Sequence, residues 1–381
     1  MSMDAPVVDP ERQQQAREYS RISRRLMLLD LVLGGIYVTA WLVFGWSEDL
    51  KSWLQGFIGQ EWLLIAGFAF IFGAIGLLLD LPISYYSDFI LPHRYGQSNQ
   101  TRSGWIMDQV KSLILAGIFG LIVLEILYFL LQQAPNTWWL WLAGVLLVFE
   151  VLLANLAPVL IFPIFYKTKL LGEEYAELSQ RLLALAVRAG AKVKGVYQFD
   201  MSTRTKSANA ALMGLGNTRR IVLGDTLLSE FTSDEIETVL AHELGHQVNK
   251  DIPLLIMFQA ILTMGGLYLA SLGLNWGISY FGFDGPADIA ALPLLILVLG
   301  IYGLVTMPLG NTISRWRERL ADEYALQLTG NGPAFAAALT RLANQNLAEV
   351  DPEPWVEFLL YSHPALSKRI AMANAVHESP V

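Results

Sequence analysis

The sequence contains no cysteine, few charged residues and no excess of basic residues. Without cysteine the chain forms no disulfide, no iron–sulfur cluster, no thiolate metal site and no cysteine nucleophile. Charged residues make up 16% of the chain, whereas a soluble domain usually carries about 25%. This deficit excludes a disordered chain and an ordinary cytosolic enzyme. The net charge of −8 provides no basic face, so we expect no nucleic-acid partner.

Apolar residues make up 54% of the chain, and many of them lie in long continuous runs. A helix that crosses a bilayer needs about 20 mostly apolar residues. The first run is not a cleaved signal peptide, because it is too long and no small-residue cleavage site follows it. We therefore predict a mostly α, polytopic membrane protein with about six transmembrane helices. The runs cover residues 26–46, 62–81, 113–131, 138–162, 252–272 and 289–309.

Lysine and arginine alternate between the two sides of these predicted spans. The leader before the first span and every second loop are basic, whereas Lys51 is the one basic residue in the other loops. Basic loops stay in the cytoplasm, so both termini and all soluble segments are expected there. The sequence shows no organelle-targeting segment, and its loops are short. Both features favour a prokaryotic plasma membrane. The expected organisation is a leader at 1–25, four spans at 26–165 with a cytoplasmic loop at 82–112, a catalytic segment at 166–251, two spans at 252–310 and a completing segment at 311–381.

The soluble segments show the pattern of a small α+β domain. An amphipathic helix is predicted over 173–189, and short strands over 196–199, 207–213 and 219–223. Gly216 and Asn217 supply the turn between the last two strands. Thr232 and Ser233, followed by two acidic residues, mark the start of another helix.

That last helix carries the sequence HELGH, residues 242–246. Residues four apart on a helix share one face, so His242 and His246 can grip one zinc ion. Glu243 then faces the open side of the metal, where it can take a proton from a bound water. Such a string arises by chance in this composition with a probability on the order of 0.003. We therefore predict a zincin-like site with one Zn²⁺ per chain.

A catalytic zinc needs a third protein ligand and an open fourth position. His363, His93 and His377 are possible ligands, but a carboxylate is the better candidate. Glu318 and Asp322 lie four residues apart on a predicted helix, so that Glu318 can bind zinc while Asp322 orients a histidine. The competing interpretation is that both acids pair with neighbouring arginines on a solvated helix. Spacing alone favours that second interpretation.

The combination of HELGH with the downstream Glu318–Asp322 pattern resembles the membrane zinc metalloproteases that include the zinc-dependent CAAX prenyl proteases and the HtpX heat-shock proteases. The resemblance implies that Glu318 is the third zinc ligand and that Asp322 is its supporting partner. Residues 207–228, SANAALMGLGNTRRIVLGDTLL, look like the family's segment before the zinc helix. Within that segment, the resemblance implies that Asn209 holds the substrate backbone.

Three further segments extend the resemblance. Residues 361–370, YSHPALSKRI, are similar to the family's C-terminal block, which implies that His363 lies near the metal and that Arg369 supports the site. Residues 81–111 and 157–171 are similar to the CAAX prenyl protease branch, and HtpX proteins are shorter with fewer spans. That branch has seven spans enclosing a large water-filled chamber, whereas six are counted here.

We therefore expect an integral membrane zinc endopeptidase of the CAAX prenyl protease type. In this hypothesis Glu243 is the general base, His363 donates to the oxyanion, and an extended peptide or protein substrate lies near Asn209. A substrate with a lipidated C-terminus is one option. An HtpX-like quality-control protease is the alternative. A six-span transporter with a regulatory metal site is a remote one, because the acids deep in the spans, Glu125 and Glu150, have no basic partner there.

Overall fold

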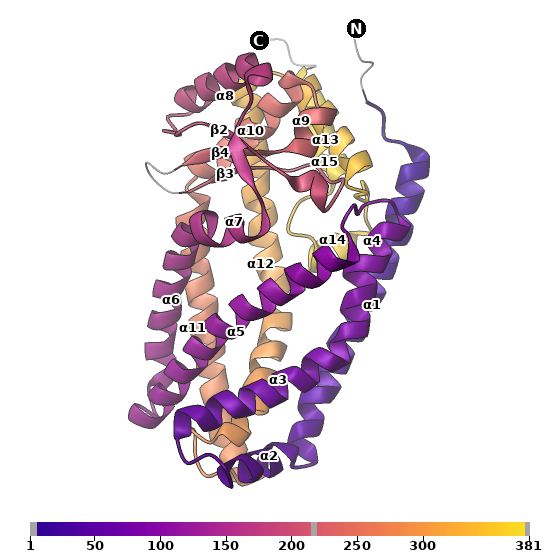
Figure 1. The fold of residues 1–381 in the computed structure, drawn as a ribbon. Helices are drawn as coiled ribbons and strands as arrows, with labels where there is room; N and C mark the ends of the chain where they lie inside the picture. Colours follow the sequence, from indigo (N-terminus) through magenta and orange to yellow (C-terminus); the bar gives the residue numbers. More distant parts are fainter. Residues whose placement is uncertain (1–5, 215–218, 378–381) are drawn as a thin grey trace.

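Long helices and a small α+β part make up the computed structural model, which describes residues 6–214 and 219–377 (Figure 1). In these two ranges six helical segments are long and apolar enough to cross a membrane, which confirms the predicted fold class. They are α1 (Pro10–Val43), α3 (Glu61–Tyr85) continued by η1 (Tyr86–Ile90) and α4 (Leu91–Arg94), α5 (Arg102–Gln133), α6 (Trp138–Leu156) continued by η2 (Ala157–Ile161) and α7 (Phe162–Phe165), α11 (Asp251–Phe281), and η6 (Ile289–Ala291) with α12 (Leu292–Thr329).

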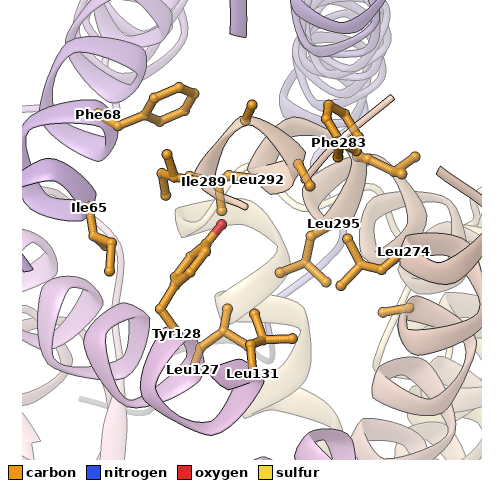
Figure 2. Close-up of a cluster of buried hydrophobic side chains, with 14 of the residues drawn as sticks. Ile65, Phe68, Leu127, Tyr128, Leu131, Leu274, Phe283, Ile289, Leu292 and Leu295 are labelled. Atoms are coloured by element: carbon orange, nitrogen blue, oxygen red, sulfur yellow. The ribbon is translucent and has the colours of Figure 1, made fainter. Parts of the chain in front are cut away.

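The six spans form a ring, because each packs against two others. Helix α1 contacts α12 and α3, α5 contacts α3 and α6, and α11 contacts α6 and α12. One apolar cluster joins all six spans, and Figure 2 shows part of it, with side chains from α3, α5, α11 and the start of α12 gathered around Tyr128. The residues of this cluster all come from the end of the spans opposite the sheet. We call this the far end and the other the sheet end.

The far end also holds a short helix that does not span. Helix α2 (Trp46–Gln55) has 10 residues, too few to cross a bilayer. It packs against η6, and the ammonium group of the buried Lys51 lies 2.8 Å from Asp288 and 2.9 Å from Asp284. Within the described residues the chain therefore has six spans, one fewer than the resemblance implies.

The sheet end holds the α+β part. Among the described residues four strands form one sheet in the order β1-β2-β4-β3, in which β2 and β4 are parallel and the other pairs antiparallel. Strand β3 is therefore an edge strand, next to α10. The elements are β1 (Thr168–Leu170), η3 (Glu173–Tyr175), α8 (Ala176–Arg188), β2 (Val196–Phe199), η4 (Met201–Thr203), β3 (Ala210–Met213), β4 (Arg220–Gly224), α9 (Asp225–Glu230), α10 (Ser233–Val248), α13 (Gly332–Gln345), α14 (Pro354–Leu360) and α15 (Leu366–His377).

The strand predicted over 207–213 begins only at Ala210. The C=O of Asn209 still accepts a hydrogen bond from the N–H of Gly224 in β4, but the residues before Asn209 bond side chains. The amide of Asn346 bonds both the N–H and the C=O of Ala208, and the amide of Gln345 donates to the C=O of Lys206. The predicted helix 173–189 opens as the 3₁₀ turn η3 before α8, and β1 is a strand that the sequence pattern did not predict. The predicted turn at residues 216–217 lies outside the described residues.

Two boundaries drawn from the sequence lie inside continuous helices. The leader at 1–25 is helical from Pro10, where Asp9 caps α1, and it runs unbroken into the first span. Its Gln13 is buried and bonds the backbone of Ala348 and Val350. Likewise α12 runs from the membrane into the α+β part without a break at residue 310. A change from apolar to charged residues without a helix breaker changes the environment of a helix but does not end it.

Helices α10 and α12 cross in backbone contact at Gly245 and Ala321. A Cβ atom on Gly245 would lie 2.9 Å from the Cα and 3.0 Å from the carbonyl oxygen of Ala321. Real Cβ atoms do not approach backbone atoms this closely, so glycine is required at this position. The crossing sets the distance between HELGH on α10 and Glu318 on α12.

We predict that Gly245→Ala forces the two helices apart. Overpacking of this kind lowers the free energy of unfolding by about 1–3 kcal/mol, and the displaced Glu318 also weakens metal binding. Thermal unfolding and zinc titration of the detergent-purified protein measure both effects. The control is Gly300→Ala on α12, where a Cβ meets no atom within 4 Å. A Gly245→Ala protein that matches wild type in both measurements contradicts the prediction.

Candidate functional site

Helix α10 begins at a capping box that fixes its first turn. Thr232 Oγ1 accepts a hydrogen bond from the N–H of Glu235, and the Glu235 carboxylate accepts one from the N–H of Thr232. Leu240 and Leu244 are fully buried and anchor one face of the helix. The neighbouring face turns His242 and His246 toward α12.

Three side chains from α10 and α12 converge on one point. The Nε2 atoms of His242 and His246 lie 3.2 Å apart. The Glu318 carboxylate lies 3.3 Å from Nε2 of His242 and 3.4 Å from Nε2 of His246. One potential ligand atom from each residue lies within 4.8 Å of the others. The structure thus brings together the three predicted metal ligands.

The geometry of these atoms fits a zinc ion. A tetrahedral zinc ion with bonds of about 2.1 Å has its ligand atoms about 3.4 Å apart. The two histidine nitrogens are 3.2 Å apart, close to that value, and the Glu318 carboxylate approaches them at similar distances, with Oε2 3.3 Å from His242 and Oε1 3.4 Å from His246. Oε2 of Glu318 is buried and has no hydrogen-bond partner within residues 6–214 and 219–377. A proton or a cation has to lie among these acceptors, and the donor set of two imidazoles and one carboxylate suits zinc.

Asp322 and Arg369 lie behind His242. Nδ1 of His242 is 2.8 Å from Oδ1 of Asp322, and the Arg369 guanidinium donates to both oxygens of that carboxylate, at 2.7 and 2.6 Å. Burial alone would lower the pKa of His242, but the carboxylates of Asp322 and Glu318 raise it to about 9. In the metal-free protein His242 is therefore protonated near neutral pH, and metal binding displaces that proton.

A second carboxylate and a second arginine lie behind His246, and the sequence reasoning missed both. Nδ1 of His246 is 2.7 Å from Oδ2 of Asp251. Nε of Arg317 donates to Oδ1 of Asp251 at 2.6 Å. The spacing between His246 and Asp251 crosses the end of α10, where Lys250 adopts a left-handed conformation with φ 55°. No helical periodicity relates residues on either side of such a turn, so the pattern of α10 gave no signal.

The competing interpretation, in which Glu318 and Asp322 pair with neighbouring arginines, does not describe the structure. Arg315 donates to the carbonyl oxygens of Glu357 and Tyr361, and Arg319 pairs with Glu323. The other proposed ligand, His93, contacts the carbonyl oxygens of Phe89 and Gln100. Glu318 and Asp322 are buried and face the histidines instead.

Glu243, His363 and Asn209 line a cavity of ≈ 180 Å³ beside the histidines. Burial raises the pKa of Glu243, while the positive charges of His242 and His246 oppose the shift. Nε2 of His363 lies 3.2 Å from Oε1 of Glu318. Asn209 directly precedes the edge strand β3 and is exposed. The remaining wall is mostly apolar and includes Val239, Phe335, Leu339 and Leu342.

Comparison with protein families matches both halves of the chain. Residues 4–167 match the model "CAAX prenyl protease N-terminal, five membrane helices", and residues 173–377 match "Peptidase family M48". Four of the spans in the described part of the chain fall within the first match, together with the short helix α2. The chain therefore departs from the description of that family module by one membrane helix.

Individual relatives match along nearly the whole chain. The Bacillus subtilis metalloprotease YhfN is 31% identical, covering 99% of this chain and 88% of that protein. CAAX prenyl protease 1 of Saccharomyces cerevisiae is 29% identical, covering 97% and 87%. The crystal structure of S. mikatae Ste24p superimposes with a TM-score of 0.85 at 27% identity, covering 98% of this chain and 92% of that one. With its metal site at His242, His246 and Glu318, the chain belongs to peptidase family M48 and is an integral membrane zinc metalloprotease of the CAAX prenyl protease type.

Proposed function

We propose that this protease holds one Zn²⁺ and cleaves protein substrates near a lipidated C-terminus of the CAAX type. The observation that carries the proposal is the match of the membrane half as well as the peptidase half to CAAX prenyl proteases. The three metal ligands all lie in the peptidase half, so the similarity of the membrane half points to a shared way of receiving substrate. A membrane protein that cuts a lipid-bearing tail needs a surface that receives the lipid next to its metal.

We assign the general base to Glu243. When bound, zinc acts as a Lewis acid and lowers the pKa of water toward about 7. Glu243 follows His242 on α10 and lines the same cavity. Its raised pKa brings the carboxylate closer to the working pH of the reaction, where a general base is most effective. The same carboxyl then delivers the proton to the leaving amine.

We assign the hydrogen bond to the developing oxyanion to His363. Its loop lies between α14 and α15, and the Glu357 carboxylate holds that loop by accepting hydrogen bonds from the N–H of Ala365 and from Lys368. Desolvation lowers the pKa of His363, with Glu318 opposing. A neutral imidazole at the edge of the cavity can donate an N–H without adding charge beside the metal.

We assign the binding of the substrate backbone to Asn209 and the edge strand that follows it. An edge strand has unpaired N–H and C=O groups that an extended peptide can join. Asn209 is exposed, whereas its neighbour Ala208 is held on both backbone groups by Asn346. The peptide would then pass the metal in an extended form.

We propose that the sheet end lies in the cytoplasm of a prokaryotic cell, with the spans in its plasma membrane. The first residues of α1 and helix α15 lie at this same end (Figure 1). The lysines and arginines of the leader and of every second loop support that orientation. The bacterial relative YhfN supports the source.

Replacement of the general base separates binding from turnover. We predict that Glu243→Gln keeps its zinc and loses about 10²–10⁴-fold in kcat. The amide has nearly the same shape as the carboxylate but takes up no proton. Metal content and kcat are measured on the same preparation. A variant that keeps wild-type turnover removes Glu243 from the mechanism.

Replacement of the third ligand should remove the metal itself. We predict that Glu318→Ala no longer holds zinc, because two histidines alone do not complete the site. Metal analysis after gel filtration measures the occupancy, and Glu323→Ala on the solvent face of α12 is the matched control. Full metal occupancy in Glu318→Ala would mean that the ligand assignment is wrong.

The substrate proposal is tested with a farnesylated CAAX peptide and its unprenylated twin, with and without a chelator. We predict chelator-sensitive cleavage with a higher kcat/KM for the prenylated peptide, because the membrane part contributes binding. Cleavage that is indifferent to the lipid would favour an HtpX-like quality-control protease. A well-folded sample without zinc or cleavage would overturn the proposed function.

A further inference from the structure

We propose that Asp251 and Arg317 are positioning residues that hold the second zinc-binding histidine, His246, in its ligating orientation. Asp251 contacts the ring of His246, and Arg317 contacts Asp251. This inference rests on the proposed binding of zinc at His242, His246 and Glu318, and it adds two residues outside the HELGH pattern to that site.

The hydrogen bond from His246 to Asp251 fixes both the tautomer and the rotation of the ring. A neutral imidazole that offers Nε2 to a metal must carry its proton on Nδ1. Nδ1 of His246 lies 2.7 Å from Oδ2 of Asp251, an acceptor that selects this tautomer. The side chain of His246 is 27% exposed, against 10% for His242. Packing therefore holds His246 less firmly, and its orientation depends more on this bond.

Arg317 pairs with Asp251 and holds its carboxylate in place. Both side chains are buried, with 3% of Asp251 and 6% of Arg317 exposed. An unpaired carboxylate at such a position would be strongly unfavourable, so the guanidinium supplies the balancing charge. The same guanidinium donates at 2.6 Å to the carbonyl oxygen of Asn249, which caps the C-terminus of the zinc helix. Arg317 thus joins the end of α10 to the start of α11.

The arrangement repeats the one around the first histidine. Arg369 contacts Asp322, and Asp322 contacts Nδ1 of His242. In both cases a carboxylate accepts from the ring nitrogen that faces away from the metal, and an arginine pairs with the carboxylate. Helix α12 contributes to both arrangements and also supplies the ligand Glu318. One face of this helix therefore orients all three zinc ligands.

A purely structural ion pair between Asp251 and Arg317 would also explain their burial. A double variant distinguishes this structural role from the positioning of His246. Asp251→Leu alone leaves the arginine charge buried and unpaired, and Arg317→Met alone leaves the carboxylate unpaired. The double variant Asp251→Leu/Arg317→Met removes both charges together and replaces them with apolar side chains, which is often neutral for stability. It still lacks an acceptor for Nδ1 of His246.

The experiment measures zinc affinity by competition with a chelating dye and the melting temperature of the metal-free protein, for wild type, both single variants and the double variant. Arg319→Ala is the matched control, because Arg319 lies on the same helix but is 69% exposed and pairs with Glu323. We expect the single variants to melt at lower temperature. In the double variant the melting temperature recovers while zinc affinity stays about 10–100-fold weaker than in wild type.

Zinc affinity in the double variant within about twofold of wild type would overturn the proposal and leave Asp251 and Arg317 as a structural pair. A comparable loss of affinity in Arg319→Ala would also overturn it, because the effect would then not depend on contact with His246. A wild-type protein that binds no zinc would overturn the proposed function and this proposal with it. Zinc binding by the wild type therefore tests the proposed function, and zinc affinity of the double variant tests the role of Asp251 and Arg317.

Discussion

The contact between Gly245 and Ala321 is the constraint on which the metal site depends. Helices α10 and α12 approach so closely there that a Cβ atom on Gly245 would collide with the backbone of Ala321. Gly245 lies on the zinc helix between His242 and His246. The same close approach of α12 that leaves no room for a Cβ atom there brings Glu318 within 3.4 Å of both rings. Helix packing thus explains the glycine in HELGH. Metal binding and catalysis explain its two histidines and Glu243.

Charge balance accounts for the other buried groups around this contact. Asp322 is paired with Arg369, and Asp251 with Arg317, so these four charges cancel in pairs. The histidines are neutral when they bind metal. Glu318 and Glu243 remain, and their two negative charges match the two positive charges of a zinc ion. A site with this balance has no need of further counter-ions, and its low exposure strengthens each of its hydrogen bonds. A zinc ion at this site would therefore complete the charge balance of the folded protein.

The sequence predicts what is encoded locally and misses what depends on the crossing of helices. The six apolar runs, the capped zinc helix and HELGH are each contained in a short stretch, and the structure has all of them. By spacing alone, Glu318 and Asp322 were better explained as partners of exposed arginines, and only the family resemblance pointed to the metal. Asp251 was missed because the left-handed turn at Lys250 separates it from His246, and Arg317 because it contacts Asp251 from 66 positions away. The late start of β3 was missed for a related reason, since the amide of Asn346 comes from a distant helix.

The two spans that follow the zinc helix connect the metal site to the membrane. Helix α11 begins at Asp251, and α12 carries Arg317, Glu318 and Asp322 on its extension beyond the bilayer. Deeper in the membrane, Gly277 of α11 faces Leu294 of α12 where a Cβ would collide with it, so the two helices are held together at the far end. The apolar cluster around Tyr128 fixes the same end of all six spans. At the sheet end the same two helices are joined by the buried pair of Asp251 on α11 and Arg317 on α12, directly behind His246. The orientation of His246 therefore depends, through Asp251, on the packing of α11 against α12 as well as on its own helix.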